Sequence, residues 1–141
     1  MRRLKLIVTI GLALLVVLAP SHAEESLTLS KLVETADTNT DGEVLAVSYL
    51  AGAGTTDLFK EIRTMNDWAK DKDADTRRGL SDLLYDCFET DGQALLARAR
   101  NDVSKGMNLD MWPALWVIKV NVAKCYHEGT DIENLHQEVT P

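Results

Sequence analysis

The sequence predicts an all-α protein, a compact bundle of about five to six helices with one disulfide. Apolar residues recur at helical spacing from residue 27 onward, without the sustained apolar and polar alternation that indicates strands. The chain begins with a pattern typical of an export signal, and it contains two cysteines, Cys87 and Cys125. An even cysteine count in an exported protein predicts one disulfide, and two separate thiols are the alternative.

The export signal occupies the first residues. Three cations precede an apolar run over residues 6–19, and Ser21-His22-Ala23 supplies small residues where a signal peptidase cuts. We expect residues 1–23 to be removed after Ala23, which leaves a single helical domain over residues 24–141. A retained membrane anchor is the alternative, but the apolar run is shorter than the roughly 20 residues that a spanning helix needs.

The mature chain is strongly acidic. Removal of the signal removes three cations, which takes the formal net charge from −7 to −10. A surface of this charge repels nucleic acid and anionic lipid, and it favours encounter with a basic protein. We therefore expect a protein partner, no nucleic acid, and no membrane contact after signal removal. Acidity that only keeps the domain soluble is the alternative.

Residues 27–36 predict a short first helix, and the next stretch resembles half of a calcium loop. Asp37, Asn39 and Asp41 occupy the first, third and fifth loop positions, and a glycine follows. The twelfth position is Ser48, which cannot supply two carboxylate oxygens. We expect residues 37–48 to connect two helices without binding calcium, with Asp41 capping the second helix.

The second helix begins near Glu43 and meets the small-residue run Ala51-Gly52-Ala53-Gly54. Two glycines inside a helix each cost about 1 kcal/mol relative to alanine, so we expect close packing there, with a bend. Thr55 or Thr56 is then expected to cap a continuation. Its apolar stripe consists of Leu58, Phe59, Ile62 and Met65.

Residues 69–78 are almost all charged or small, which predicts an exposed connection between helices. Apolar stripes resume at residues 80–87 and again at residues 95–103, after a turn at Asp91-Gly92. Gly106 is expected to end the latter helix.

The most apolar stretch, residues 111–126, predicts a central helix. Asp110 is expected to cap it, and Pro113 falls in the first turn, where its missing amide proton costs little. Asn121, Lys124 and Glu128 form one narrow polar strip. Lys119 lies on the opposite side, within a face made by Trp112, Leu115, Trp116, Val122 and Ala123. A lysine there must reach a carboxylate, extend to water, or contact another chain.

No pattern in the sequence indicates catalysis. No serine or cysteine has a nucleophile motif around it, and no glycine-rich phosphate loop follows a strand. The spacing of His127 and His136 among carboxylates matches no established zinc pattern. We expect no enzyme activity, no metal and no cofactor.

Two sets of residues resemble the Rap/Tai immunity proteins of type VI secretion. In "SYLAGA", residues 48–53, Tyr49, Leu50 and Gly52 match a Gly-Tyr-Leu-x-Gly element, with Ser48 in place of the first glycine. Further along, a cysteine before an amphipathic helix and a Pro-Ala that opens an apolar helix ending in cysteine recur as Cys87, Pro113-Ala114 and Cys125. The chain departs from the family pattern at Val47, where relatives carry an additional cysteine, and at Phe88, where they often have proline.

The resemblance implies a small periplasmic protein that binds a peptidoglycan amidase secreted by sibling cells and occludes its active site. It also implies a homodimer. The alternative is a small periplasmic helical chaperone or stress-response binding protein, which would expose apolar surface at low pH. For contact with the partner, an aromatic anchor flanked by carboxylates on an exposed connection is the best candidate. The candidate partner-binding residues are Trp68, Asp71, Asp73 and Asp75, together with Lys119.

Overall fold

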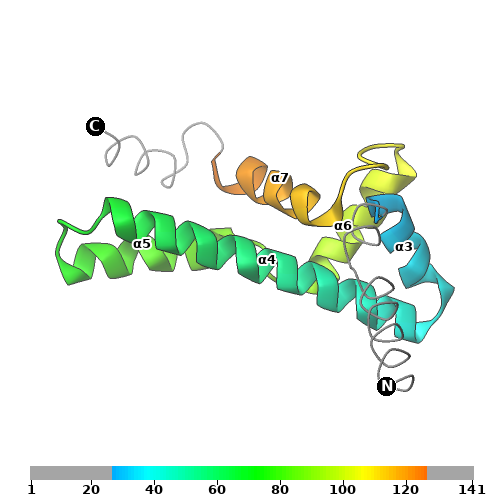
Figure 1. Ribbon diagram of the computed structural model, residues 1–141, viewed down its shortest axis with the longest axis horizontal. Coiled ribbons are helices and arrows are strands. Elements are labelled where there is room, and N and C mark those ends of the chain that lie inside the picture. Colours follow the sequence, from blue (N-terminus) through cyan, green and yellow to red (C-terminus); the bar gives the residue numbers. More distant parts are fainter. Residues whose placement is uncertain (1–26, 127–141) are drawn as a thin grey trace, which may run out of the picture.

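The computed structural model describes residues 27–126, and the apolar spacing within that range produces five α-helices and no strands. They are α3 (Leu29–Thr38), α4 (Thr40–Trp68), α5 (Ala74–Cys87), α6 (Gly92–Ser104) and α7 (Pro113–Cys125). Figure 1 shows an elongated bundle with α4 along its whole length, α5 against one half of α4, and α3 and α6 at the opposite end. The predicted all-α bundle with one disulfide is confirmed. The predicted signal segment and its cleavage site lie outside the described residues.

A single residue, Asn39, separates α3 from α4. Thr28 caps α3 by accepting a hydrogen bond from the Lys31 amide, and Asn39 caps α4 by accepting one from the Gly42 amide at 2.8 Å. The predicted cap at Asp41 is therefore wrong, because Asp41 already lies in the first turn of α4. Its carboxylate still lies near the positive end of the helix dipole, as expected.

Helix α4 continues without interruption through the small-residue run. The predicted new helix start at Thr55 or Thr56 is wrong, because residues 40–68 form one α-helix. Close packing was predicted correctly at Gly54, where an added Cβ would lie 2.5 Å from the Glu89 carbonyl oxygen. At Gly52 the prediction was wrong, since an added Cβ there would meet no atom within 4 Å.

The remaining helix ends follow from local sequence. Asp73 caps α5, which starts at Ala74, so the connection predicted over residues 69–78 is shorter than expected and its second half is helical. Asp91 caps α6. Gly106 follows α6 with a φ of 71°, a left-handed conformation that ends the helix as predicted. Helix α7 starts at Pro113 with no side-chain cap, so the predicted cap at Asp110 is wrong.

The buried apolar residues form two clusters. At one end, which we call the four-helix end, α3, α6 and the first halves of α4 and α7 enclose a core that includes Leu50, Leu96 and Trp116. At the other, the hairpin end, the second half of α4 packs on α5 and on the last residue of α7. The disulfide between Cys87 and Cys125 joins α5 to α7 there, with a Cα–Cα distance of 5.6 Å. Across residues 27–126, no helix combines the length and apolar content needed to cross a bilayer.

Candidate partner-binding surface

The predicted anchor Trp68 is the last residue of α4 and is partly exposed. The carboxylates that follow it have different local roles. Asp73 accepts a hydrogen bond from the Thr76 amide at 2.7 Å, and hydrogen bonding to Thr76 holds the pKa of Asp73 below its usual range. Asp75 lies 3.6 Å from Arg78, and Asp71 is exposed in the connection. At least one of these carboxylates, that of Asp73, is therefore already engaged in capping α5.

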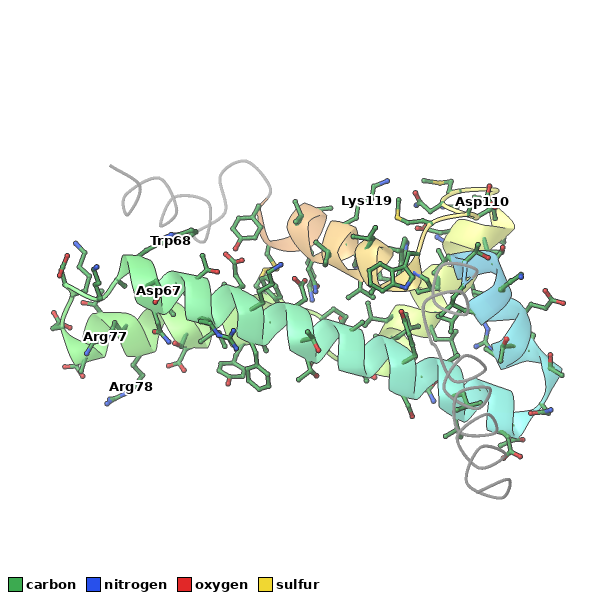
Figure 2. The ribbon with its side chains drawn as sticks, viewed as in Figure 1. Asp67, Trp68, Arg77, Arg78, Asp110 and Lys119 are labelled. Carbon is green, nitrogen blue, oxygen red and sulfur yellow. A yellow bond between two sulfur atoms is a disulfide. The ribbon has the colours of Figure 1, made fainter. Side chains whose placement is uncertain are left out.

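Cations balance these carboxylates around the tip of the α4–α5 hairpin, residues 67–78, which we call the hairpin tip. Lys70, Lys72, Arg77 and Arg78 match Asp67, Asp71, Asp73 and Asp75 in number. The guanidinium of Arg77 donates to the Lys70 and Lys72 carbonyl oxygens at 3.2 and 3.0 Å, which closes the connection. Figure 2 shows Arg77 and Arg78 at the same end of the molecule as Trp68, on the opposite edge of the hairpin. The tip is therefore a neutral mixture of charges, although the chain as a whole is acidic.

Lys119 lies well away from the hairpin tip. In Figure 2, Trp68 and Lys119 occupy separate parts of the molecule, so the structure does not bring the predicted partner-binding residues together. Lys119 is exposed, and its ammonium donates to the Asn108 side-chain oxygen at 3.1 Å. Lys119 therefore extends to the surface of the molecule, and its contact with another chain stays a prediction.

The face around Lys119 is apolar and exposed. We call it the α7 face, and it consists of Trp112, Leu115, Ile118, Lys119 and Val122. Leu115 is 52% exposed and Val122 is 50% exposed. Met107 and Leu109, in the loop before α7, are also exposed. Side chains of this kind normally occupy a core, so a run of them along one helix makes this face a candidate interaction surface.

A buried asparagine determines which side of α7 turns inward. Asn121 belongs to the narrow polar strip of this helix, yet its side chain is fully buried. Its side-chain oxygen accepts from the Glu89 amide, and its nitrogen donates to the Asp57 carboxylate, both at 2.9 Å. Burial raises the pKa of Asp57, although the Asn121 hydrogen bond acts in the opposite direction. Because these hydrogen bonds hold Asn121 inside, the opposite side of α7 faces outward.

The end of α7 is fixed by several further contacts. The Tyr126 hydroxyl donates to the Glu61 carboxylate, and burial together with that hydrogen bond raises the pKa of Tyr126. Lys124 lies 3.5 Å from the Glu89 carboxylate on the loop before α6. With the disulfide at Cys125, these contacts hold the helix against α4 and α5 and make the α7 face a rigid surface.

The loop before α7 is anchored by Asp102. One oxygen of this carboxylate accepts from the Trp116 indole at 2.9 Å and from the Asn108 side chain at 3.2 Å. Asn108 has a φ of 56°, a left-handed conformation that asparagine tolerates better than most residues. Lys119 bonds to this same asparagine, so the loop and the α7 face form one connected surface.

The other candidate regions are weaker. A groove of about 460 Å³ lies between α3 and α6. It is lined by Ser30, Val33, Glu34, Asp37, Thr38 and Val103. In the calcium-like stretch, Asp37 pairs with Arg100 at 2.9 Å and Asn39 caps α4. Within residues 27–126 no group of three or more potential metal ligands is found. That this stretch does not bind calcium stays a prediction.

Sequence reasoning named Lys119 and its apolar neighbours, but it did not identify the α7 face as the exposed side, because nearly the whole circumference of this helix is apolar. The pattern therefore carried no information on which side is buried. Lys119 was the available signal, since an unpaired lysine is more easily accommodated at a surface than in a core. Comparison of the chain with protein-family models, curated proteins and solved structures finds no match.

Proposed function

We propose that this chain is a periplasmic immunity protein that binds a secreted peptidoglycan amidase and inhibits it by occluding its active site. The observation that carries the proposal is the exposed apolar α7 face, which suits contact with another protein. The export pattern, the acidic mature chain and the Rap/Tai-like residues at 48–53, 87, 113–114 and 125 agree with it. The protein then acts by binding, with no catalytic role of its own.

The α7 face is a better contact surface than the hairpin tip for two reasons. Its side chains lie on one helix that the disulfide and Asn121 hold in place, so little conformational freedom is lost on binding. It also combines a tryptophan anchor with neighbouring aliphatic side chains, which is typical of the centre of an interface. The hairpin tip offers Trp68 among balanced charges, of which Asp75 and Arg78 pair with each other and Arg77 bonds to the Lys70 carbonyl oxygen.

The test is inhibition of a cognate amidase. Any amidase-like toxin found to be encoded next to this gene is the first enzyme to assay, with peptidoglycan hydrolysis measured at increasing amounts of the mature chain, residues 24–141. We expect hydrolysis to stop near equimolar protein. Continued hydrolysis at a large excess of the correctly folded chain would refute the proposal.

Two substitutions locate the contact surface. We expect Leu115→Asp to weaken the complex by about 2 kcal/mol or more, as loss of a central interface residue does. Trp68→Ala is the matched change at the hairpin tip, and it should have a smaller effect. If Trp68→Ala weakens the complex and Leu115→Asp leaves it unchanged, the tip is the contact surface and our assignment to α7 is wrong. Neutralising Asp71, Asp73 and Asp75 should then slow association and flatten its dependence on salt.

A homodimer is part of this proposal, because the resemblance implies one. Sedimentation of the mature chain at several concentrations measures it directly, and a monomer at high concentration would remove the dimer from the proposal. The amidase assay is independent of that outcome.

A periplasmic chaperone is the second candidate, favoured by the same exposed apolar side chains. Such a surface would bind many unfolded clients in place of one folded enzyme. Protection of an aggregating test protein at acid pH, combined with no inhibition of the neighbouring amidase, would favour the chaperone.

A further inference from the structure

One side of α4 is left exposed by the other helices of residues 27–126. At 100° per residue, seven residues on this side lie within about 40° of the direction of Gly52. We call them the α4 stripe, and all seven are exposed: Asp41, Leu45, Ser48, Gly52, Thr56, Phe59 and Arg63. Leu45 is 66% exposed and Phe59 is 50% exposed, so the stripe presents large apolar side chains to solvent.

The α4 stripe points away from α7. Asp57 and Glu61 are the residues of α4 that bond to Asn121 in α7 and to Tyr126 directly after it. The same helical geometry directs Asp57 and Glu61 about 140° and 180° away from Gly52. A partner on the α4 stripe therefore leaves the α7 face free.

The apolar and small residues of the stripe are arranged symmetrically about Gly52. Leu45 precedes this glycine by seven residues, and Phe59 follows it by seven. Ser48 and Thr56 stand four residues away on either side. If an antiparallel copy of α4 met this helix at Gly52, the apolar side chains would therefore lie level with each other, and so would the two hydroxyls.

The charges at the two ends of the stripe have the same symmetry. Asp41 precedes Gly52 by 11 residues, and Arg63 follows it by 11. These two residues are separated by about 33 Å along one helix, so they cannot pair within a single chain. Within residues 27–126 neither forms an ion pair. An antiparallel copy would bring each Asp41 level with the Arg63 of the other chain.

We propose that the α4 stripe binds a second copy of this chain, antiparallel and related by a two-fold axis at Gly52. A two-fold axis makes each contact twice, so it requires a surface that is complementary to itself. Leu45 and Phe59 form the apolar parts of the contact, and the Asp41–Arg63 pairs fix its register and direction. At the axis, an added Cβ on Gly52 would meet no atom within 4 Å, so the two helices can approach closely there.

This inference deepens the proposed function, because it assigns a surface to the dimer that the proposed function includes. It rests on that dimer and does not depend on an amidase. Since the α7 face lies on another side of the molecule, a dimer formed through the α4 stripe presents two α7 faces to further partners.

Sedimentation of the mature chain at several concentrations measures the dissociation constant of the dimer. We expect Gly52→Glu to raise this constant about 10-fold or more, because two carboxylates would meet at the axis. Gly79→Glu is the matched control. Gly79 is an exposed glycine of α5 where an added Cβ would also meet no atom within 4 Å, so the same change there should leave the constant unchanged.

Charge reversal tests the register without altering the glycine. Arg63→Asp should raise the dissociation constant about 10-fold, because each new carboxylate would face Asp41 of the other copy. Asp41→Arg combined with Arg63→Asp should restore the dimer, since the same pairs form again with their charges exchanged. Circular dichroism of each variant checks that the helices are retained.

Three results would overturn the proposal. The first is a mature chain that stays monomeric at high concentration, and the second is a dimer that Gly52→Glu leaves intact. The third is a dimer that Leu115→Asp dissociates, because the contact would then lie on the α7 face. Inhibition of the amidase is measured separately, so failure of the amidase proposal and failure of this one are distinguishable.

Discussion

The four-helix end and the hairpin end share helix α4, but they bury it by different means. At the four-helix end, neighbours on several sides cover α4, and Ala46 and Leu50 have no exposed surface. At the hairpin end, the tip of α4 packs mainly on α5, and large side chains such as Phe59 stay half exposed. Covalent and polar contacts supplement the smaller core there, namely the disulfide and the hydrogen bonds of Asn121 and Tyr126.

The difference teaches how a long helix is stabilised along its length. Burial of apolar area requires neighbours on several sides, and a hairpin of two helices supplies only one. The hairpin end is therefore the part of the molecule that depends most on its cross-link. We expect it to open locally before the four-helix end does.

The largest expected effect is at the four-helix core. Trp116→Ala should lower the free energy of unfolding by about 3–5 kcal/mol, because it leaves a cavity and removes one of the two side-chain hydrogen bonds that the Asp102 carboxylate accepts. Trp112→Ala is the matched control on the same helix, and its cost should be about 1 kcal/mol or less because that side chain is 41% exposed. Urea unfolding of both variants measures the difference. Equal costs would mean that the inward side of α7 is misassigned.

Loss of the disulfide should have the second-largest effect on the free energy of unfolding. Replacing both cysteines by serine should cost up to about 4 kcal/mol, because the bond restricts the unfolded chain. Hydrogen exchange should show the greater loss of protection at the hairpin end, in α5 and the second half of α4. Equal loss at both ends would contradict the view that the hairpin end opens separately. In the native protein, mass spectrometry after alkylation should find no free thiol.

Two of the three glycines in α4, Gly52 and Gly54, should give smaller effects of opposite sign. Gly54→Ala should destabilise the protein by about 1–3 kcal/mol, because the new methyl group meets the Glu89 carbonyl oxygen. Gly52→Ala should stabilise it by up to about 1 kcal/mol, since alanine favours the helix and the site is open. Thermal unfolding of the two variants compares them directly. The same sign for both would show that close approach at Gly54 does not matter.

The smallest expected effect comes from Asp57, where the two ends meet. Burial raises the pKa of this carboxyl above its ordinary value of 3.8, so the folded state binds the proton more tightly than the unfolded state does. Its contribution to stability is present below that value and is lost as pH rises through the folded pKa. Solvent screening should limit it to a fraction of a kcal/mol.

The variant Asp57→Asn isolates this contribution, because asparagine does not titrate and still offers an oxygen to Asn121. The unmodified protein should lose stability relative to the variant as pH rises from about 4 toward neutrality. Chemical unfolding at several pH values measures the difference between the two proteins. A difference that stays constant with pH would show that the carboxyl is fully solvated.

Local sequence patterns predicted the helices well where one feature dominates. Residues 27–36 predicted the first helix, and its apolar residues Leu29, Leu32 and Val33, which share one side of α3, are all buried. The disulfide also followed from the sequence, since two cysteines behind an export-like N-terminal pattern have one internal pairing to form. The structure does not bring the predicted site residues together, since Trp68 and Lys119 lie on different helices. A local sequence pattern contains no information about the distance between two helices.

Helix type and helix ends were thus largely determined by the sequence itself, because caps, glycines and apolar spacing act over a few residues. The tertiary structure decided two further matters. It kept α4 continuous through its glycines, where Gly54 packs against the Glu89 carbonyl, and it chose the inward side of α7. That helix is apolar almost all round, so hydrophobicity alone gives no preferred side. The hydrogen bonds of Asn121 to Asp57 and Glu89 bury its one inward polar side chain and leave Lys119 with its apolar neighbours at the surface.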